Sequence, residues 1–183
     1  IQGLLELAAI PYVGCGVLAS AACMDKAVAN TIMDAYHVPH CHWCSAVRAE
    51  AETQRSALLT RVENRLPYPI FVKPANAGSS VGITKAHNRE ELNTAIDTAL
   101  REDDKVVFEE FIDGQEVECA GLARCDFFVE HGTGRVLCNE LNTLPGFTPI
   151  SMYPKLMENE GYSFAALVDK LIGLALSKKR GAY

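Results

Sequence analysis

Long hydrophobic runs are missing from this sequence of 183 residues. No window reaches the roughly 18 uninterrupted apolar residues that a membrane-spanning helix needs, and no basic, signal-like leader stands at its start. An excess of positive charge is missing as well, because 17 Lys and Arg stand against 23 Asp and Glu and give a net charge of -6. There is thus no global positive field to attract phosphate backbones or anionic lipid. We expect a cytoplasmic protein that binds neither nucleic acid nor membranes.

Internal repeats and low-complexity tracts are also absent. Hydrophobic residues make up 49% and charged residues 22% of the chain, which is usual for packed, soluble domains. This balance excludes disorder, collagen and coiled coil. The length allows one domain or two small ones, at roughly 100 to 200 residues per domain.

Seven cysteines form an odd set, and most of them lie inside apolar runs, where a free thiol packs as a small hydrophobic side chain. This usage fits a reducing compartment. Cys41 and Cys44 differ, since Cys-x-x-Cys spacing with histidines beside it occurs in redox pairs and in halves of zinc sites. No comparable second Cys/His pair occurs elsewhere, so we favour thiols that are incidental to a strand or loop.

The first part of the chain predicts a strand over 10–13, a glycine turn and a helix over 17–36. The glycines of residues 14–19 superficially match a dinucleotide-binding fingerprint. That fingerprint requires an acidic residue at the end of a further strand, whereas Asp34 falls within the helical pattern. We therefore disfavour a dinucleotide site.

The middle of the chain predicts a charged helix over 49–65, a strand over 68–74 closed by proline, and a loop over 75–82. Asn88 is expected to cap the next helix, with Glu91 as its capping-box partner. The spacing of the apolar residues gives this helix one buried face.

Farther on, the pattern predicts a strand over 106–112 that forms a hairpin with 116–120. A second hairpin is expected between 121–129 and 135–142. The tail of the chain predicts a helix over 163–177, because apolar residues recur there at helical spacing.

The loop that follows Lys73 has the composition of a phosphate cradle. A strand-end ammonium precedes small residues whose backbone amides and hydroxyls can approach an anion closely. It is not a Walker A motif, since the lysine precedes the glycines. A flexible turn explains the composition equally well.

Two polar pairs lie on neighbouring predicted strands: Arg124 with Asp126, and Glu140 with Asn142. Residues two apart in a strand share a face, so the hairpin would bring the pairs opposite each other. Carboxylate and amide oxygens are ligands that Mg2+ prefers, and Arg124 beside them could hold a transferring phosphoryl group. The alternative is a surface ladder of ion pairs, which we disfavour because the neighbouring residues are apolar.

A loop rich in proline and glycine, residues 142–154, follows the proposed metal ligands. Its neutral composition suits the binding of a small carboxylate by backbone amides and Ser151. An ordinary connecting loop has the same composition.

Several motifs of one known family occur here in the family's order. They are Met24-Asp25-Lys26, Phe71-Val72-Lys73-Pro74, Gly78 to Gly82, Glu109 to Ile112 with Glu116-Val117, Arg124-x-Asp126, and Asn139 to Thr148. The chain resembles the D-alanine-D-alanine ligases of the ATP-grasp superfamily. The resemblance covers nearly the whole chain, and its last motif is highly specific.

The resemblance implies an α+β fold of the ATP-grasp type, with two α+β subdomains holding ATP between them and the remnant of an α/β N-terminal domain before them. We expect the end of the N-terminal domain over 1–22, the central subdomain over 23–112 and the C-terminal subdomain over 113–183. Relatives carry several dozen residues between positions 120 and 121, so we expect a segment to be missing there. The acidic residue that holds the first D-alanine's ammonium is also absent from the N-terminal part.

The resemblance also implies functional residues. Nucleotide binding would fall to Lys26, Lys73, Gly78, Ser79, Ser80, Val81, Glu109, Glu110, Phe111, Ile112 and Glu116. Glu110 stands where some relatives have lysine. Asp126, Glu140 and Asn142 would bind two Mg2+ ions, for which Mn2+ can substitute. Arg124, Ser79 and Gly146 would act in catalysis, and Ser151 and Met152 would contact the amino acids.

The implied reaction joins two D-alanines through an acyl phosphate at the expense of ATP, for peptidoglycan precursors, in an enzyme that is commonly a homodimer. One alternative is a D-alanine-D-serine or D-alanine-D-lactate ligase of the glycopeptide-resistance type. Another is a nucleotide-binding remnant without catalytic activity, because fold does not guarantee function.

Overall fold

The structure, a computed structural model, describes residues 1–78, 80–120, 123–148 and 150–177, with the side chains of Cys119 and Ala120 excepted. The chain forms two compact units. The larger unit comprises Met24–Val117 and Phe127–Glu140, and the smaller unit comprises Ile1–Cys23, Glu118–Asp126 and Leu141–Tyr183. None of the helices described is both long and apolar enough to cross a membrane.

The larger unit is built on an antiparallel sheet with the strand order β1-β4-β2-β3. Its strands are β1 (Trp43–Val47), β4 (Lys105–Glu110), β2 (Ile70–Pro74) and β3 (Thr84–Ala86). Alternation along β4 sends Val106 and Phe108 to one face of the sheet and Val107 and Glu109 to the other. This alternation gives the two faces different partners.

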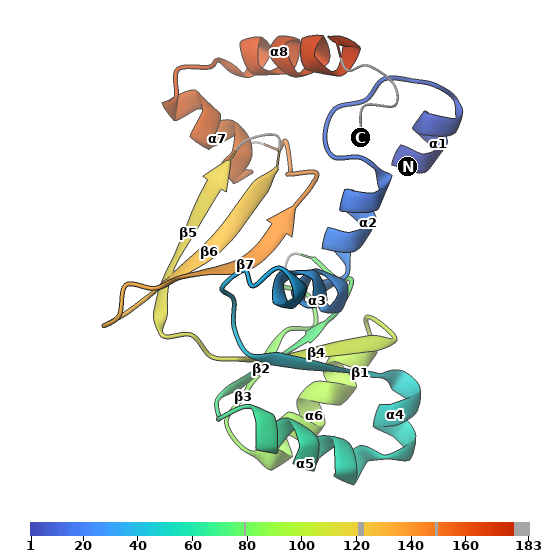
Figure 1. Ribbon diagram of the computed structural model, residues 1–183, viewed down its shortest axis with the longest axis vertical. Coiled ribbons are helices and arrows are strands. Elements are labelled where there is room, and N and C mark those ends of the chain that lie inside the picture. The colour runs from blue at the N-terminus through green and yellow to red at the C-terminus, as the bar shows by residue number, and fades with distance from the viewer. Residues whose placement is uncertain (79, 121–122, 149, 178–183) are drawn as a thin grey trace. The chain divides into compact units, whose positions relative to one another are not determined.

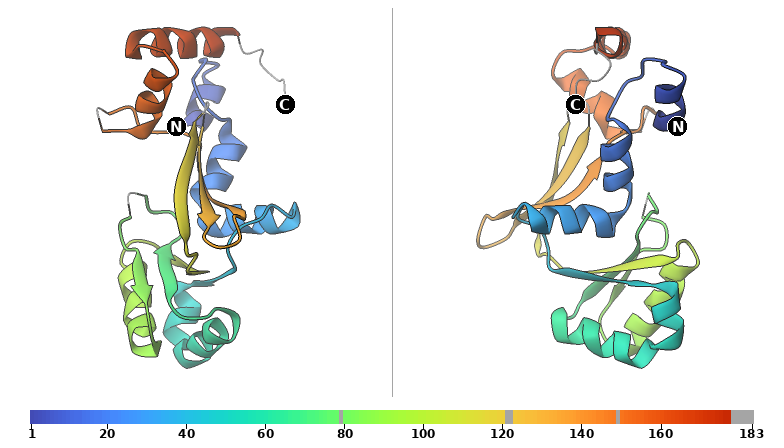
Figure 2. Two further views of the ribbon diagram at one scale, coloured as in Figure 1. Left: turned by 90° about the vertical axis from the view of Figure 1, so that its left-hand side faces the viewer. Right: turned by 45° about the vertical axis from the view of Figure 1, so that its right-hand side comes forward.

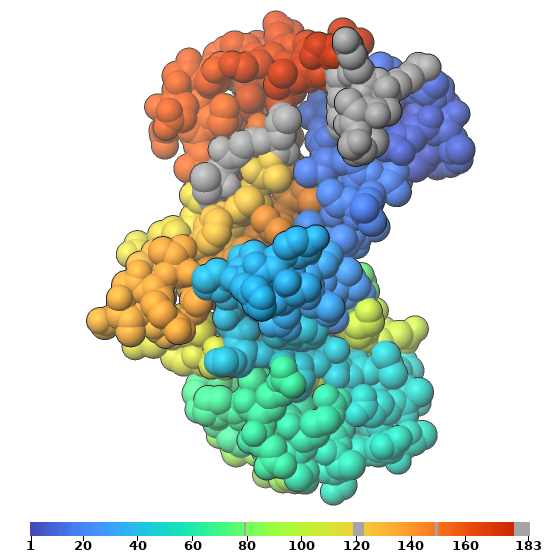
Figure 3. Space-filling view, viewed as in Figure 1, coloured from blue at the N-terminus to red at the C-terminus, as the bar shows by residue number. Residues whose placement is uncertain are grey.

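Helices cover both faces of this sheet, as Figures 1 and 2 show. On one face, α4 (Arg48–Thr53), α5 (Arg55–Arg65) and α6 (Arg89–Leu100) surround a core that includes Phe108. On the other face, α3 (Lys26–Ala35) packs Ala27 against Val107 and Trp43. The outer side of α3 lies at the surface in Figure 3. Lys73 and Glu109, described below, lie on the α3 side of this sheet.

The continuous helices predicted over 17–36 and 49–65 were wrong in one respect, since each is two helices. Residues 17–36 form α2 (Val17–Met24) and α3, separated by Asp25. The Asp25 carboxylate accepts hydrogen bonds from the backbone amides of Ala27 (3.0 Å) and Val28 (3.2 Å). A capping carboxylate of this kind begins a new helix and so ends the preceding one. Gln54 separates α4 from α5, but its side chain makes no capping hydrogen bond.

The strand predicted over 10–13 was wrong, because these residues pair with no strand in the structure described. They follow a short helix, α1 (Gln2–Leu7), and the Ile10 amide donates to the Leu5 carbonyl at 2.8 Å. The backbone there closes a helix end instead of joining a sheet. The strand required by a dinucleotide fingerprint is therefore missing.

The hairpin predicted between 106–112 and 116–120 was also wrong. Both edges of β4 are already taken, one by β1 and one by β2, so no edge remains for the following strand. That strand, β5 (Gly114–Ala120), instead joins a second sheet with the order β5-β6-β7. The competition for strand edges decided the pairing.

The second predicted hairpin is confirmed within the residues described. It consists of β6 (Arg124–Glu130) and β7 (Val136–Asn142), and the Glu130 amide donates to the Arg135 carbonyl at 2.9 Å. Residues 121 and 122, where the prediction began this strand, lie outside the residues described.

The end of the chain confirms the predicted tail helix as α8 (Phe164–Ser177). A further helix, α7 (Met152–Asn159), begins inside the segment predicted as a loop. Tyr153 of α7 and Leu167 and Leu171 of α8 form a small buried cluster.

The predicted helix cap at Asn88 is confirmed, since its side-chain oxygen accepts from the Glu91 amide at 3.0 Å. The Glu91 carboxylate accepts from the His87 amide at 2.8 Å. The capping interaction thus reaches one residue farther back than a capping box between Asn88 and Glu91.

Candidate functional site

A buried ion pair lies on the α3 side of the larger unit. In the sheet Phe71 lies opposite Glu109 and Lys73 lies opposite Val107, so Lys73 and Glu109 are diagonal neighbours on one face. Lys73 Nζ and Glu109 Oε2 are 2.5 Å apart, and their side chains are 14% and 7% exposed. Asn30 of α3, also buried, donates its amide to Glu109 Oε1 at 3.3 Å. Sequence inspection missed Asn30, which has no motif of its own.

The pair keeps Lys73 charged. Burial by itself lowers the pKa of Lys73, but the charge of Glu109 and its hydrogen bond outweigh burial, and the pKa is raised. The charge of Glu140, on β7, contributes in the same direction. Lys73 is therefore a fixed ammonium, held in place by carboxylates and able to attract an anion.

The predicted phosphate loop, residues 75–82, begins directly after Lys73. Lys26, at the first position of α3, donates its ammonium to the Ala77 carbonyl at 2.8 Å and its backbone amide to the Ala75 carbonyl at 3.0 Å. The structure thus brings the two predicted phosphate-binding lysines to the same short stretch of chain. Gly78, Ser80 and Val81 are exposed, and Ser79 lies outside the residues described.

An aromatic group lies on the same side of the sheet as Lys73. The rings of Phe71 and Phe111 are 6.3 Å apart, and the Lys85 ammonium lies 3.6 Å from the centroid of the Phe111 ring. Phe111 is 40% exposed. A ring-lined, partly open surface beside an ammonium suits a planar aromatic ligand. Phe71 and Lys85 were not predicted, although two-residue spacing places Phe71 on the face of Lys73.

The other predicted nucleotide-binding residues have separate contacts. Glu110 Oε1 accepts from the His42 amide at 2.7 Å, and Glu116 Oε1 accepts from the Asn139 side chain at 3.1 Å. Ile112 is half-buried in the connection between β4 and β5. Over the residues described, no hydrogen bond or ion pair joins these three side chains to Lys73 or Glu109.

In the smaller unit, Arg124 and Asp126 form a two-pronged ion pair. Arg124 Nε lies 2.8 Å from Asp126 Oδ1 and Nη2 lies 2.7 Å from Oδ2, and Asp126 is only 3% exposed. The Asn142 side chain lies 3.2 Å from Asp126 Oδ2. Glu118 Oε1 lies 3.5 Å from Arg124 Nε. The predicted contact between Arg124 and Asp126 on one strand is therefore observed, and so is the predicted contact between this pair and Asn142 on the next strand.

The chemistry of these side chains fits Mg2+. A buried carboxylate and a side-chain amide meet at Asp126 and Asn142, and both offer the hard oxygen donors that this ion takes. Over the residues described, no group of three or more His, Cys, Asp or Glu is arranged to hold a metal. Mg2+ that arrives with a nucleotide requires only one or two carboxylates, because phosphate and water supply the other ligands.

The loop before α7 gathers the predicted catalytic and substrate residues of the smaller unit. Ser151 Oγ accepts from the Thr148 amide at 3.0 Å, and a Cβ on Gly146 would lie only 2.7 Å from that oxygen. Met152 begins α7 and is 42% exposed. Gly146 and Ser151 therefore lie side by side, and the close approach needs a residue without a side chain.

The thiols of the Cys-x-x-Cys motif are buried and free. Cys44 lies in β1, and Cys41 just precedes it. Burial raises the pKa of both thiols, most strongly that of Cys41. Because the thiolate is the reactive form, this environment favours the interpretation as packing residues over a redox pair.

Two solved structures resemble this fold over 95% of the chain. The D-alanine-D-alanine ligase from Coxiella burnetii is 34% identical with a TM-score of 0.81, and the VanG D-Ala:D-Ser ligase from Enterococcus faecalis is 32% identical with a TM-score of 0.84. The chain covers 63% and 68% of those two chains. With the site geometry above, these similarities define an ATP-grasp ligase fold. The family described as D-ala D-ala ligase C-terminus matches residues 32–120 and 117–173. The chain belongs to the D-alanine-D-alanine ligase family.

Among curated proteins, the D-alanine-D-alanine ligase of Caldicellulosiruptor bescii is 39% identical over 243 residues, with 98% of this chain and 67% of that protein covered. The chain spans about two thirds of the length of the curated relatives it matches. The aligned stretch exceeds the 183 residues of this chain by 60, so the relative has at least that many residues without a counterpart here. The two matched family segments meet at residues 117–120. Gly121, where the missing segment was predicted to end, lies outside the residues described.

Proposed function

We propose that this protein is an ATP-dependent ligase that joins two D-alanines for peptidoglycan precursors. The observation that carries the proposal is the 39% identity to a D-alanine-D-alanine ligase over 98% of the chain. The curated relatives favour D-alanine over D-serine and D-lactate as the second substrate. ATP is the expected phosphoryl donor. We expect a cytoplasmic location, where ATP is available. The family also leads us to expect a homodimer, which light scattering can test.

In the larger unit, we propose that the ammonium groups of Lys26 and Lys73 hold the phosphates of ATP. The backbone amides of the exposed residues Gly78 and Ser80 would bind the same anion. Val81, whose amide donates to the Gly78 carbonyl at 3.2 Å, would line the same loop. Glu109, Glu110, Phe111 and Ile112 would meet the adenine, and Glu116 the ribose. Two observations support this proposal: Lys73 stays charged although it is buried, and aromatic rings lie on its side of the sheet.

We propose that Asp126, Glu140 and Asn142 hold Mg2+, or Mn2+ in its place. When bound, these ions neutralise charge on the polyphosphate. Arg124, which Asp126 orients through two hydrogen bonds, would stabilise the charge that develops on the transferred group. The Gly146 amide would bind the oxyanion of the tetrahedral state. Ser79, Ser151 and Met152 would position the amino acids, and Ser79 is proposed from the family alone.

The proposed reaction has two steps. A carboxylate oxygen of the first D-alanine attacks the γ-phosphorus of ATP, the bond to the bridging oxygen breaks, and ADP leaves. The neutral amine of the second D-alanine then attacks the acyl carbon, phosphate leaves, and the amine loses its extra proton to solvent. The protein's contribution is mainly the positioning of reactants and the stabilisation of negative charge.

The test begins with the intact mass of the purified full-length protein, because a mass well above 19.9 kDa reveals residues beyond this sequence. ADP release is then measured with ATP, Mg2+ and D-alanine, with Lys73→Met as the inactive control. Dipeptide formation supports the proposal. Product from D-serine or D-lactate in competition with D-alanine would favour the resistance-type ligases instead. ATP binding without turnover of any D-amino acid would identify a nucleotide-binding remnant.

A further inference from the structure

The turn after α6, residues 101–104, holds the start of the loop 75–82. Asp103 Oδ2 accepts two hydrogen bonds from Asn76, one from the backbone amide at 2.7 Å and one from the side-chain amide at 2.8 Å. The other oxygen of Asp103 accepts from the Asp104 amide at 2.7 Å. One carboxylate thus ties Asn76, three residues after Lys73, to a separate part of the chain.

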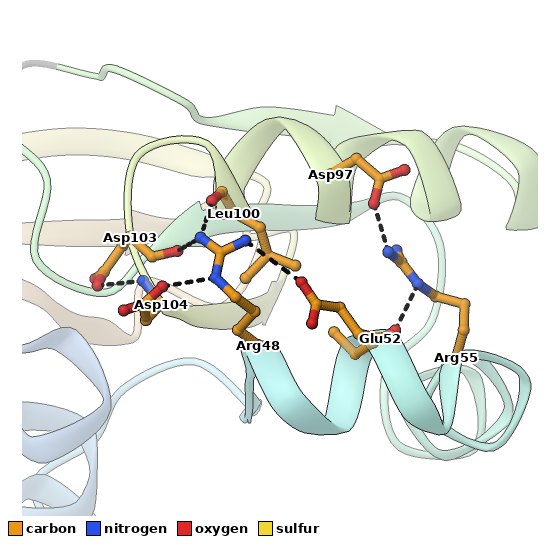
Figure 4. Close-up of polar contacts among 8 residues, drawn as sticks. Arg48, Glu52, Arg55, Asp97, Leu100, Asp103 and Asp104 are labelled. Atoms are coloured by element: carbon orange, nitrogen blue, oxygen red, sulfur yellow. Dashed lines mark hydrogen bonds and ion pairs between the residues drawn. The ribbon is translucent and has the colours of Figure 1, made fainter.

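The turn itself is fixed from its other side. Figure 4 shows Arg48, at the start of α4, reaching the turn with its guanidinium. Arg48 Nε lies 2.6 Å from Asp104 Oδ1, and Nη2 donates to the carbonyls of Leu100 and Asp103. In addition, the Ala75 amide donates to the Lys105 carbonyl at 2.9 Å. The contacts from Arg48 therefore fix the turn that carries Asp103.

The far end of the same loop also rests on this turn. Gly82 has a φ of +72°, and a Cβ at that position would lie 2.9 Å from Glu102 Cγ and 3.1 Å from Pro74 Cγ. Only glycine allows both this backbone conformation and this close approach. Asp103 thus holds Asn76 at one end of the loop, and Glu102 lies close to Gly82 at the other end.

The bonds from Asn76 also favour the ionised form of Asp103. Burial raises the pKa of Asp103, but the hydrogen bonds from Asn76, together with those from the backbone amides of Asp104 and Lys105, outweigh burial, so the pKa is lowered. Hydrogen bonds to an ionised acceptor are stronger than those between neutral groups. The contact is therefore suited to hold Asn76, at the start of the loop, in one conformation.

We infer that Asp103 is a positioning residue for nucleotide binding, acting through Asn76 on the loop 75–82. The inference rests on the proposed function. A loop that is ordered before the nucleotide arrives avoids the entropy cost of being ordered around its phosphates. Loss of the Asp103 contact therefore weakens ATP binding and leaves the binding of D-alanine unchanged.

The test compares Asp103→Ala with Asp97→Asn in the full-length protein. Asp97 serves as the control because it is also an ion-paired carboxylate of this region, but it holds Arg55 and does not contact the loop. We expect Asp103→Ala to raise the KM and the Kd for ATP about tenfold, the factor that corresponds to roughly one charge-assisted hydrogen bond. The KM for D-alanine and kcat at saturating ATP should change less than about twofold.

A swap of the two partners provides the rescue. Asn76→Asp alone places two carboxylates within hydrogen-bond distance and should weaken ATP binding. Adding Asp103→Asn restores a carboxylate–amide pair across the same gap, so the double variant should bind ATP more tightly than Asn76→Asp. A merely stabilising contact would shift the melting temperature without this recovery of ATP affinity.

The outcomes separate the two proposals. An active enzyme in which Asp103→Ala leaves the KM and the Kd for ATP unchanged overturns the inference and leaves the ligase function in place. A wild-type protein that binds ATP but releases no ADP with D-alanine overturns the ligase function, while calorimetric titration of ATP still decides the role of Asp103. A wild-type protein that binds no ATP overturns both.

Discussion

Replacing the buried Lys73–Glu109 pair tests whether the site is organised by this charge pair. Lys73→Met leaves the Glu109 carboxylate, 7% exposed, with the hydrogen bond from Asn30 but without its counter-ion. Glu109→Leu leaves an ammonium that is 14% exposed without its counter-ion. Removing one partner of a buried ion pair costs about 3 to 5 kcal/mol, and we expect about 3 kcal/mol for each variant because Lys73 keeps some contact with water.

The double variant Lys73→Met/Glu109→Leu should recover most of this loss. Two apolar side chains of similar size replace the pair, which is often close to neutral in stability. The remaining cost is about 1 kcal/mol, because Asn30 loses its acceptor. The two single losses should therefore fail to add, with an interaction free energy of at least about 3 kcal/mol.

Urea unfolding followed by tryptophan fluorescence measures these free energies. Trp43 is the single tryptophan and lies opposite Glu109 in the sheet, so its signal reports the larger unit. If the double variant loses as much stability as the two single variants together, the assignment of a coupled charge pair is refuted. ATP affinity should stay low in Lys73→Met and in the double variant, because the apolar replacement restores packing but not the ammonium.

Three further predictions concern single positions. Gly82→Ala should lower the free energy of unfolding by at least about 1 kcal/mol, because φ at this position is positive and the new Cβ would lie 2.9 Å from a neighbouring side-chain carbon. Gly78→Ala is the control: its Cβ would have nothing within 4 Å, so urea unfolding should show almost no change. Asp126→Asn should slow ADP release with D-alanine by about 100-fold or more, while Asp113→Asn, a change in an exposed ion pair, should leave the rate unchanged. The pKa of Asp103 is lowered from its ordinary value of 3.8, so its stabilising effect is present above that value and is lost as pH falls through the native pKa. In urea titrations, the difference in unfolding free energy between wild type and Asp103→Asn should thus stay constant from neutral pH down to about pH 4 and vanish at lower pH. A difference that grows as the pH falls would contradict the assignment.

Local patterns predicted those elements whose signals lie close together in the chain. The cap at Asn88, the hairpin that brings Asp126 within hydrogen-bond distance of Asn142, and the apolar stripe of α8 each depend on residues a few positions apart or on one alternation along a strand. These predictions were correct. The helix over 17–36 failed because apolar spacing continued through Asp25, whose carboxylate nevertheless caps a new helix.

The sequence pattern did not reveal which strands pair with each other when they lie far apart in the chain. The expected hairpin after β4 failed because both edges of β4 were taken by strands from earlier in the chain, and a strand pattern does not state which edges are free. Likewise the segment over 10–13 has the composition of a strand but no partner among the residues described. Element type was therefore easier to predict than element pairing.

The sequence by itself determined the family, the order of the motifs and the kinds of side chain that the site offers: lysines, a loop of small residues, and oxygen ligands with an arginine. Only the tertiary structure decided which of these side chains touch. Asn30 and Glu109 are 79 positions apart and Asn76 and Asp103 are 27 apart, yet each pair is joined by a hydrogen bond. Such contacts leave no periodic signal, because they arise where separately formed helices and strands pack and must satisfy buried or ordered polar groups. For this reason the supporting residues of the site became apparent from the fold, whereas its motifs were visible in the chain.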